Sequence, residues 1–194
     1  MHPEYTAYLD ESSALRSGER QEYLVCAAVI PSAEAESIRE SLLPLRLKGQ
    51  IKLHWTDESS RRRREIVERV SELSPMSAVV THLSQRQNKT ERFRRKCLET
   101  MYYQLANMGV LQVTCESRTE SQNKKDLAHI VALRGQKVVS TDFLISHCRG
   151  GEDPLLWLPD IFLGAINSNH LGESEYLEQL KGFLVLEEKT PESL

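Results

Sequence analysis

The order of apolar and polar positions along the chain predicts strands that alternate with helices. Short runs rich in β-branched and aromatic residues predict strands at residues 5–9, 23–30, 77–83, 110–116 and 138–146. Apolar residues at helical spacing predict helices within residues 32–45, 57–73, 120–133 and 172–180, one from Asn88 or Thr90 to about 108, and one that begins at Leu155 or Pro159. This succession is typical of a single α/β domain with a mixed central sheet, expected at residues 1–186, with a mobile tail at 187–194.

The first predicted strand runs into two adjacent carboxylates, Asp10 and Glu11, which are followed by Ser12 and Ser13. Aspartate and glutamate are uncommon within strands, so Asp10 either marks the strand end or projects from the sheet for a chemical reason. The ordinary explanation is a strand that enters a polar turn, and the polar residues 14–22 predict a hairpin connection there. This segment alone leaves both explanations open.

Two further carboxylates lie at the end of an apolar segment or inside one. Glu116 closes another predicted strand, and Asp160 lies within the apolar run at residues 157–166. A place at the start of a helix is the competing explanation for Asp160, because Pro159 suits the first helical position. Together with Asp10, these acids predict one shared site.

A cluster of buried carboxylates requires a counter-charge, since each carboxylate raises the cost of ionising the others. A divalent cation supplies that charge. Oxygen ligands without a set of cysteines and histidines favour Mg²⁺ or Mn²⁺ over Zn²⁺, and two such ions held by carboxylates are the usual clamp for phosphodiester cleavage. The three acids therefore predict a Mg²⁺ or Mn²⁺ site.

Four segments carry a resemblance to a known family: Tyr-Leu-Asp-Glu-Ser at residues 8–12, the strand at 23–30, Lys-Leu-His at 52–54 and the apolar run at 156–166. Through them the chain resembles the domain of unknown function 3800 family (DUF3800), whose members look like RNase H-fold, RuvC-like proteins. Ser13 stands where the first motif usually has glycine, and Pro159 stands where the last usually has alanine.

This resemblance implies an α/β RNase H-like fold, with a mixed central β-sheet flanked by helices, and a metal-dependent nuclease centre. It implies Asp10, Glu116 and Asp160 as the acids of that centre, with Glu11 as a fourth candidate. It also places a histidine at the position of His54. The role of His54 stays open between a hydrogen bond to a loop and a catalytic task, such as orienting water, protonating a leaving oxygen or contacting a phosphate.

Basic residues near these motifs are candidates for contact with nucleic-acid phosphates. Residues 61–64 are four consecutive arginines in a predicted helix, so at most two can face one ligand, and Arg61 and Arg64 are the candidates. A solvated helix face paired to neighbouring acids is the alternative. Arg118, two residues after Glu116, is expected either to contact a scissile phosphate or to pair with that carboxylate.

Composition narrows the class of protein. A formal net charge of −3 argues against a strongly basic coat for nonspecific binding of nucleic acid, but it allows local basic patches. The four cysteines are far apart and form no C-x-x-C pair, which predicts neither a zinc site nor disulfides. No apolar stretch reaches the length of a membrane span, and the first residues do not resemble a secretory signal. We therefore expect a cytoplasmic protein without a membrane partner.

The sequence predicts a metal-dependent nuclease that hydrolyses phosphodiesters of nucleic acid, with Asp10, Glu11, His54, Glu116 and Asp160 as catalytic residues. The first alternative is a catalytically inactive RNase H-like module that binds nucleic acid or protein through its basic helices. The second is a structural or antitoxin-like subunit that oligomerises through apolar helices. The choice between DNA and RNA, the number of metal ions and the oligomeric state stay open.

Overall fold

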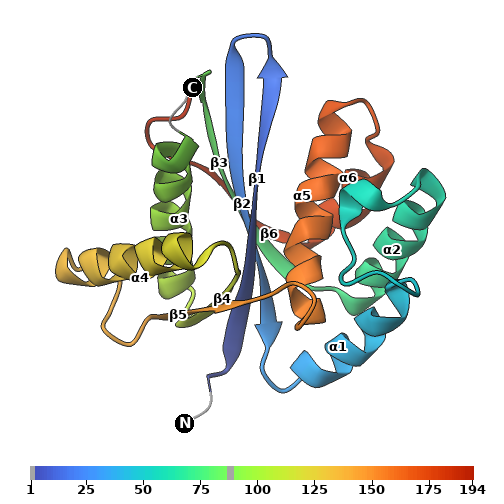
Figure 1. Ribbon diagram of the computed structural model, residues 1–194, viewed down its shortest axis with the longest axis horizontal. Helices are drawn as coiled ribbons and strands as arrows, with labels where there is room; N and C mark the ends of the chain where they lie inside the picture. Colours follow the sequence, from blue (N-terminus) through green and yellow to red (C-terminus); the bar gives the residue numbers. More distant parts are fainter. Residues whose placement is uncertain (1–2, 87–89) are drawn as a thin grey trace.

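The computed structural model describes residues 3–86 and 90–194, and within them one mixed sheet forms the centre of the molecule (Figure 1). Its strand order is β5-β4-β1-β2-β3-β6. The described strands are β1 (Tyr5–Ser17), β2 (Arg20–Pro31), β3 (Met76–Gln85), β4 (Gln112–Glu116), β5 (Leu144–Cys148) and β6 (Leu184–Lys189). β2 runs antiparallel to β1 and β3, whereas the pairs β1–β4, β4–β5 and β3–β6 are parallel.

Helices cover both faces of this sheet (Figure 1). The described α-helices are α1 (Ala35–Leu42), α2 (Ser60–Leu73), α3 (Thr90–Asn107), α4 (Glu120–Gly135), α5 (Trp157–His170) and α6 (Glu175–Leu180). One hydrophobic core lies between the sheet and α1, α2, α5 and α6, and a second lies between the sheet and α3 and α4. The predicted α/β fold class, a mixed central sheet flanked by helices, is confirmed. Among the described helices, none combines the length and apolar character that crossing a membrane would require.

The alternation of side chains along β1 decides which face each acid occupies. Tyr8 packs into the core beneath α5, whereas Ala7 and Leu9 pack into the core beneath α3 and α4. Because successive side chains of a strand point to opposite faces, Asp10 belongs to the face of Tyr8 and Glu11 to the face of Leu9. The two adjacent carboxylates are therefore separated by the sheet.

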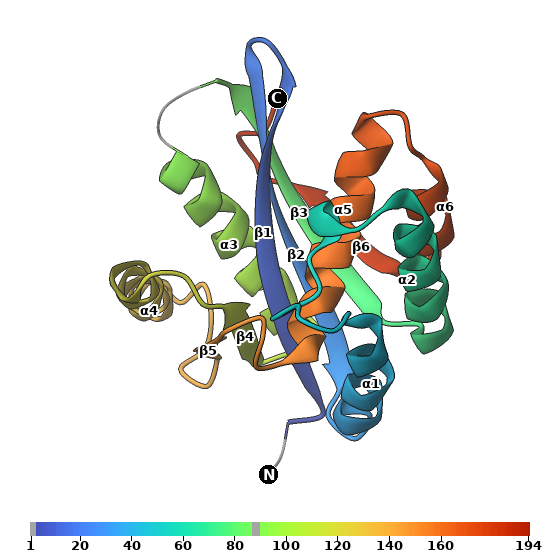
Figure 2. The ribbon, with the colours of Figure 1, turned by 45° about the vertical axis from the view of Figure 1, so that its right-hand side comes forward.

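The expectation that the first strand ends near Asp10 is wrong, because β1 continues to Ser17. The pairing of β1 with β2 extends through Ser13 opposite Tyr23 and Leu15 opposite Gln21. The polar residues that resemble a loop in the sequence thus form the last part of β1 and the start of β2, and β3 lies beside β2 as far as Arg20, which is opposite Gln85. The β1–β2 turn lies at one end of the sheet in both views (Figures 1 and 2). Asp10 thus projects from the middle of a strand, and the strand-end explanation is excluded.

Other predicted boundaries shift by a few residues. α2 begins at Ser60 rather than Asp57, because the Ser59 side chain accepts from the Arg62 backbone N–H and caps the helix there. The strand predicted at residues 138–146 is shorter and forms β5 only from Leu144 onward. α3 begins at Thr90, and the alternative start at Asn88 lies outside the described residues.

The segment expected to be a mobile tail, residues 187–194, lies along β3. Residues 187–189 complete β6, and the backbone N–H of Thr190 donates to the Thr81 carbonyl at 2.9 Å. Thr190 is buried, and its hydroxyl lies 2.5 Å from Nδ1 of His82. These contacts are the physical reason why the segment differs from the expected free tail.

Trp55 packs the segment around it against α5, where its indole ring lies close to Gly164. A methyl group at position 164 would lie 2.1 Å from Cγ of the Trp55 indole. We expect Gly164→Ala to lower the free energy of unfolding by about 1–3 kcal/mol through overpacking, although alanine favours a helix more than glycine does. Urea unfolding, with Trp fluorescence, measures the change.

Gly135→Ala is the matched control, because Gly135 is also helical and no described atom would lie within 4 Å of the added carbon. This variant should be as stable as the wild type or slightly more so. Equal stability of Gly164→Ala and Gly135→Ala would show that Trp55 does not pack on α5 as described.

Candidate active site

Two neighbouring strands bring Asp10 and Glu116 together. β4 pairs in parallel with β1, with Cys115 opposite Leu9, so that the next residue of each strand is a carboxylate. Glu116 is the last residue of β4, as predicted, and the strand beyond it gives way to a loop. β1 continues past this point without β4 beside it, which leaves space next to Asp10.

Asp160 comes from the first turn of α5, on the same face of the sheet as Asp10. Its Oδ2 accepts from the backbone N–H of Trp55 at 2.8 Å, and its two oxygens lie 3.2 and 3.3 Å from Nδ1 of His54. Leu156 is the N-cap residue of α5, and no side chain caps the helix there. The Asp160 carboxylate therefore binds another segment of the chain instead of capping its own helix.

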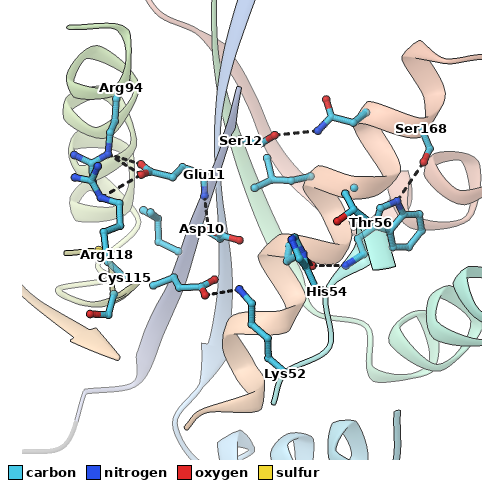
Figure 3. A pocket seen from close by; sticks show the side chains of 18 of the residues that line it. Asp10, Glu11, Ser12, Lys52, His54, Thr56, Arg94, Cys115, Arg118 and Ser168 are labelled. Carbon is cyan, nitrogen blue, oxygen red and sulfur yellow. Dashed lines mark hydrogen bonds and ion pairs between the residues drawn. The ribbon is translucent and has the colours of Figure 1, made fainter. Parts of the chain in front are cut away.

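His54 and Lys52 belong to the segment that Trp55 anchors. Figure 3 shows their side chains and that of Asp10 directed into the space between β1 and α5. The Nζ of Lys52 forms an ion pair with Oε1 of Glu116. Lys52 is not among the site residues predicted from the sequence, although its position two residues before His54 in an extended segment indicates that both side chains share a side.

One pocket, with a volume of about 490 Å³, contains most of the predicted site residues. A volume of this size is usual for small-molecule and cofactor sites. The predicted residues that line it are Asp10, Glu11, His54, Glu116, Arg118 and Asp160. The pocket wall also includes Lys52, Arg63, Arg94 and Asn167, which the sequence did not single out. The structure thus brings residues from β1, β4, α5 and the 52–56 segment to one place.

The three carboxylates on this face oppose one another's ionisation. Burial raises the pKa of Asp10 to about 8, and the negative charges of Glu116 and Asp160 contribute to this rise. The Glu11 backbone N–H, which donates to Asp10 Oδ1 at 2.8 Å, offsets only part of it. The hydrogen bond with Asp160 raises the pKa of His54, which favours the imidazolium form beside that carboxylate.

Glu11 lies on the other face of the sheet, within a buried ionic network that we call the Arg94 cluster. Its five members are Glu11, Arg94, Arg118, Asp126 and His147. Arg94 Nε lies 2.8 and 2.6 Å from the two oxygens of Glu11, and the remaining nitrogens of its guanidinium bind both oxygens of Asp126 at 2.7 and 2.9 Å. The carboxylate of Glu11, for which a catalytic role is predicted, is therefore paired with Arg94.

Arg118 belongs to the same cluster. Its guanidinium donates to Asp126 at 3.3 Å and lies 3.5 Å from Glu11. The pairing with Glu116 that the sequence suggested does not occur, because the partner of Glu116 is Lys52. Arg118 nevertheless lines the pocket, so its expected contact with a phosphate stays a prediction.

Arg61 and Arg64 lie away from the pocket. The Arg61 side chain is 88% exposed and pairs with Glu65, and that of Arg64 is 60% exposed and pairs with Glu175. This is the arrangement of a solvated helix face. Arg63 is the member of the run that lines the pocket, with its guanidinium 5.2 Å from the Trp55 ring centroid.

The next question is whether the side chains of this pocket fit a divalent cation. Among the described residues, no three Asp, Glu, His or Cys side chains converge closely enough to form a ready-made metal site. The chemistry of the donors nevertheless suits a hard cation, because Asp10, Glu116 and Asp160 offer carboxylate oxygens to one pocket. In this arrangement Lys52 holds Glu116 and His54 holds Asp160.

Comparison with known proteins gives a distant structural likeness. The chain is similar to a chain of the PCNA:RNase HII complex from Archaeoglobus fulgidus, with 13% sequence identity and a TM-score of 0.42 over 91% of this chain and 78% of that chain. It is also similar to a mutant form of Bst-RNase HIII, with 9% identity and a TM-score of 0.39 over 91% of this chain and 53% of that one. It therefore spans about half the length of the second protein.

At these values the likeness is confined to the general arrangement of strands and helices. No protein-family model and no curated protein sequence matches the chain. The resemblance to the DUF3800 family therefore stays a prediction from the sequence.

Proposed function

We propose that this protein hydrolyses phosphodiester bonds of nucleic acid with Mg²⁺ or Mn²⁺ held by the carboxylates of Asp10, Glu116 and Asp160. The observation that carries the proposal is the meeting of three carboxylates, from β1, β4 and α5, in one pocket. Carboxylates that share a partly buried pocket oppose one another's charge, and a divalent cation relieves that conflict. Asp10 bears this cost, because the charges of Glu116 and Asp160 contribute to its raised pKa.

A bound divalent cation supplies an activated water and stabilises the charge on the leaving oxygen. The chain's own residues position the groups around it. The Trp55 backbone N–H and His54 fix the orientation of Asp160. With Nδ1 of His54 committed to Asp160, its Nε2 is the atom suited to move a proton to or from the substrate.

Basic side chains in the pocket suit a polyanionic substrate. Arg63 and Arg118 line it together with Lys52, although the chain as a whole has a net charge of −3. Basic side chains at the wall of a cleft that also contains acids can contact phosphates without making the whole surface basic. We therefore propose nucleic acid as the partner, with a contact from Arg118, as predicted, and one from Arg63 in place of those predicted for Arg61 and Arg64.

The test is cleavage of labelled single-stranded DNA, single-stranded RNA, duplex DNA and an RNA–DNA hybrid, with Mn²⁺, Mg²⁺ or EDTA. We expect cleavage of at least one substrate with metal and none with EDTA. Asp160→Asn should reduce the rate to background, and Asp142→Asn, which changes an exposed acid outside the pocket, should leave it unchanged. Full activity of Asp160→Asn would overturn the proposal.

A second candidate function is a binding module without catalysis. The observation that favours it is the pairing of Glu116 with Lys52 and of Asp160 with His54, which neutralises two of the carboxylates without an ion. Such a protein would bind the same nucleic acids equally well in EDTA. Its affinity would fall steeply as salt is added, and it would cleave none of the four substrates.

A further inference from the structure

We infer that the ammonium group of Lys52 takes the place of a second metal ion, so that the site holds one divalent cation, at Asp10 and Asp160. This inference rests on the proposed metal-dependent hydrolysis. It assigns Glu116 a different task from the other two acids. Glu116 holds Lys52, and the lysine provides the positive charge on that side of the pocket.

The pairing of Lys52 with Glu116 is built into the fold. Their side chains are only 30% and 20% exposed, so the pair is not a loose surface contact. The loop after β5 closes over it at Gly150. A Cβ atom at this position would lie 2.8 Å from both Glu116 Oε1 and Lys52 Cδ, so that only glycine fits without a shift.

A second contact holds that loop in place. The indole N–H of Trp157, at the start of α5, donates to the Gly150 carbonyl at 2.6 Å. Gly150 and Trp157 are both buried. The loop, the helix and the two strands thus surround the Lys52–Glu116 pair, which limits the freedom of Glu116 to turn toward an ion.

The remaining carboxylates are arranged differently. Asp160 accepts a backbone N–H at 2.8 Å and lies against the His54 ring, and both contacts orient its oxygens. Its partner His54, unlike Lys52, carries a positive charge only when it is protonated. Asp10 receives the Glu11 backbone N–H at 2.8 Å, and no side chain forms an ion pair with it in the described part of the chain. Asp10 is therefore the carboxylate that most requires a cation.

A charge count agrees with a single ion. Asp10, Glu116 and Asp160 carry three negative charges when ionised. Lys52 neutralises one of them, and a protonated His54 beside Asp160 neutralises another. The negative charge that remains is no more than one divalent cation balances. A second divalent cation would leave an excess of positive charge beside the lysine, and like charges at short range in a partly buried pocket repel strongly.

The experiment measures the stoichiometry and affinity of Mn²⁺ binding, by calorimetry and by electron paramagnetic resonance of free Mn²⁺. The proteins are the wild type, Lys52→Met, Glu116→Gln and the double variant, with Asp10→Asn as the reference for loss of binding. The wild type should bind one ion. Glu116→Gln should weaken binding far less than Asp10→Asn does.

Lys52→Met should bind a second ion, or bind one at least about tenfold more tightly, because Glu116 becomes free to act as a ligand. The double variant should lose this gain, since the gained affinity depends on Glu116. Lys48→Met, which removes an exposed lysine four residues earlier, should match the wild type. Circular dichroism confirms that each variant is folded.

The outcomes separate this inference from the proposed function. Two ions of comparable affinity in the wild type would overturn the role of Lys52 and leave a metal-dependent centre in place. Unchanged binding in Lys52→Met would do the same. Absence of Mn²⁺ binding in the wild type would overturn the inference, and its absence in Lys52→Met as well would overturn the proposed metal centre itself.

Discussion

Replacing Arg94 by methionine should lower the free energy of unfolding by about 3–5 kcal/mol, the usual cost of breaking a buried ion pair from one side. The Arg94 side chain is 6% exposed and binds Glu11 and both oxygens of Asp126. Methionine fills a similar volume but donates no hydrogen bond. The loss of stability therefore comes from the carboxylates of Glu11 and Asp126, which lose a positively charged hydrogen-bond donor, and not from a cavity.

The pH dependence of this loss follows from Asp126. Burial alone would raise the pKa of Asp126, but hydrogen bonds from His147 and Arg94 hold it well below its usual range. The stabilisation from ionised Asp126 is present above its unfolded pKa of about 4 and is lost as the pH falls further. Urea unfolding should therefore show a large deficit for Arg94→Met at pH 7 and a smaller one near pH 3.

Arg95→Met is the control for this prediction. Arg95 is the next residue of α3, but its side chain is exposed. A surface change of this kind is expected to alter stability by less than about 0.5 kcal/mol. If the two variants were equally stable at pH 7, the Arg94 cluster would contribute nothing to the fold, and Glu11 would be free to act elsewhere.

The separation of Asp10 from Glu11 was predictable from the sequence in principle. Successive side chains of a strand face opposite ways, so two adjacent acids on β1 cannot share a site on one face. The resemblance implies Glu11 as a further acid of the same centre, and a strand that ends at Asp10, as the sequence predicts, does not exclude this. The polar residues after Asp10 have a loop pattern, yet they pair with β2, which in turn pairs with β3.

Each of the three carboxylates of the candidate site lies at the end of an apolar segment or inside one, and this pattern is the sequence signal for the site. Neither Lys52 nor Arg94 gives such a signal. Lys52 stands between Ile51 and Leu53 and Arg94 follows Phe93, but long basic side chains beside apolar residues commonly reach solvent. Their partners, Glu116 and Asp126, are 64 and 32 residues away in the chain. Contacts of this kind depend on strand register and helix placement, which the local pattern does not contain.

Replacing Asp10 by asparagine should make the metal-free protein more stable at neutral and alkaline pH. Asparagine has nearly the same shape, and its carbonyl oxygen can accept the Glu11 backbone N–H that Asp10 accepts at 2.8 Å. It removes a charge that burial and the neighbouring Glu116 and Asp160 oppose. The variant therefore keeps the hydrogen bond and loses the electrostatic conflict.

The sign and the pH range follow from the pKa of Asp10, which is about 8 in the folded chain. An unfolded aspartate ionises near pH 4, so between about pH 4 and 8 the folded chain keeps a proton that the unfolded chain has lost. Asp10 therefore lowers stability progressively over this range. Asp10→Asn should match the wild type near pH 4 and exceed it at pH 8 by roughly 3–5 kcal/mol, at about 1.4 kcal/mol per pKa unit.

Urea unfolding in EDTA at pH 4, 6 and 8 measures this gain, and Asp142→Asn, at an exposed acid, should show no trend with pH. Equal stability of Asp10→Asn and the wild type at pH 8 would contradict the crowding of carboxylates. Millimolar Mn²⁺ should then stabilise the wild type and leave the variant unchanged, because a ligand stabilises only a folded state that binds it. A carboxylate that destabilises the chain without an ion and stabilises it with one is retained for binding that ion, and this exchange of stability for function is typical of active sites.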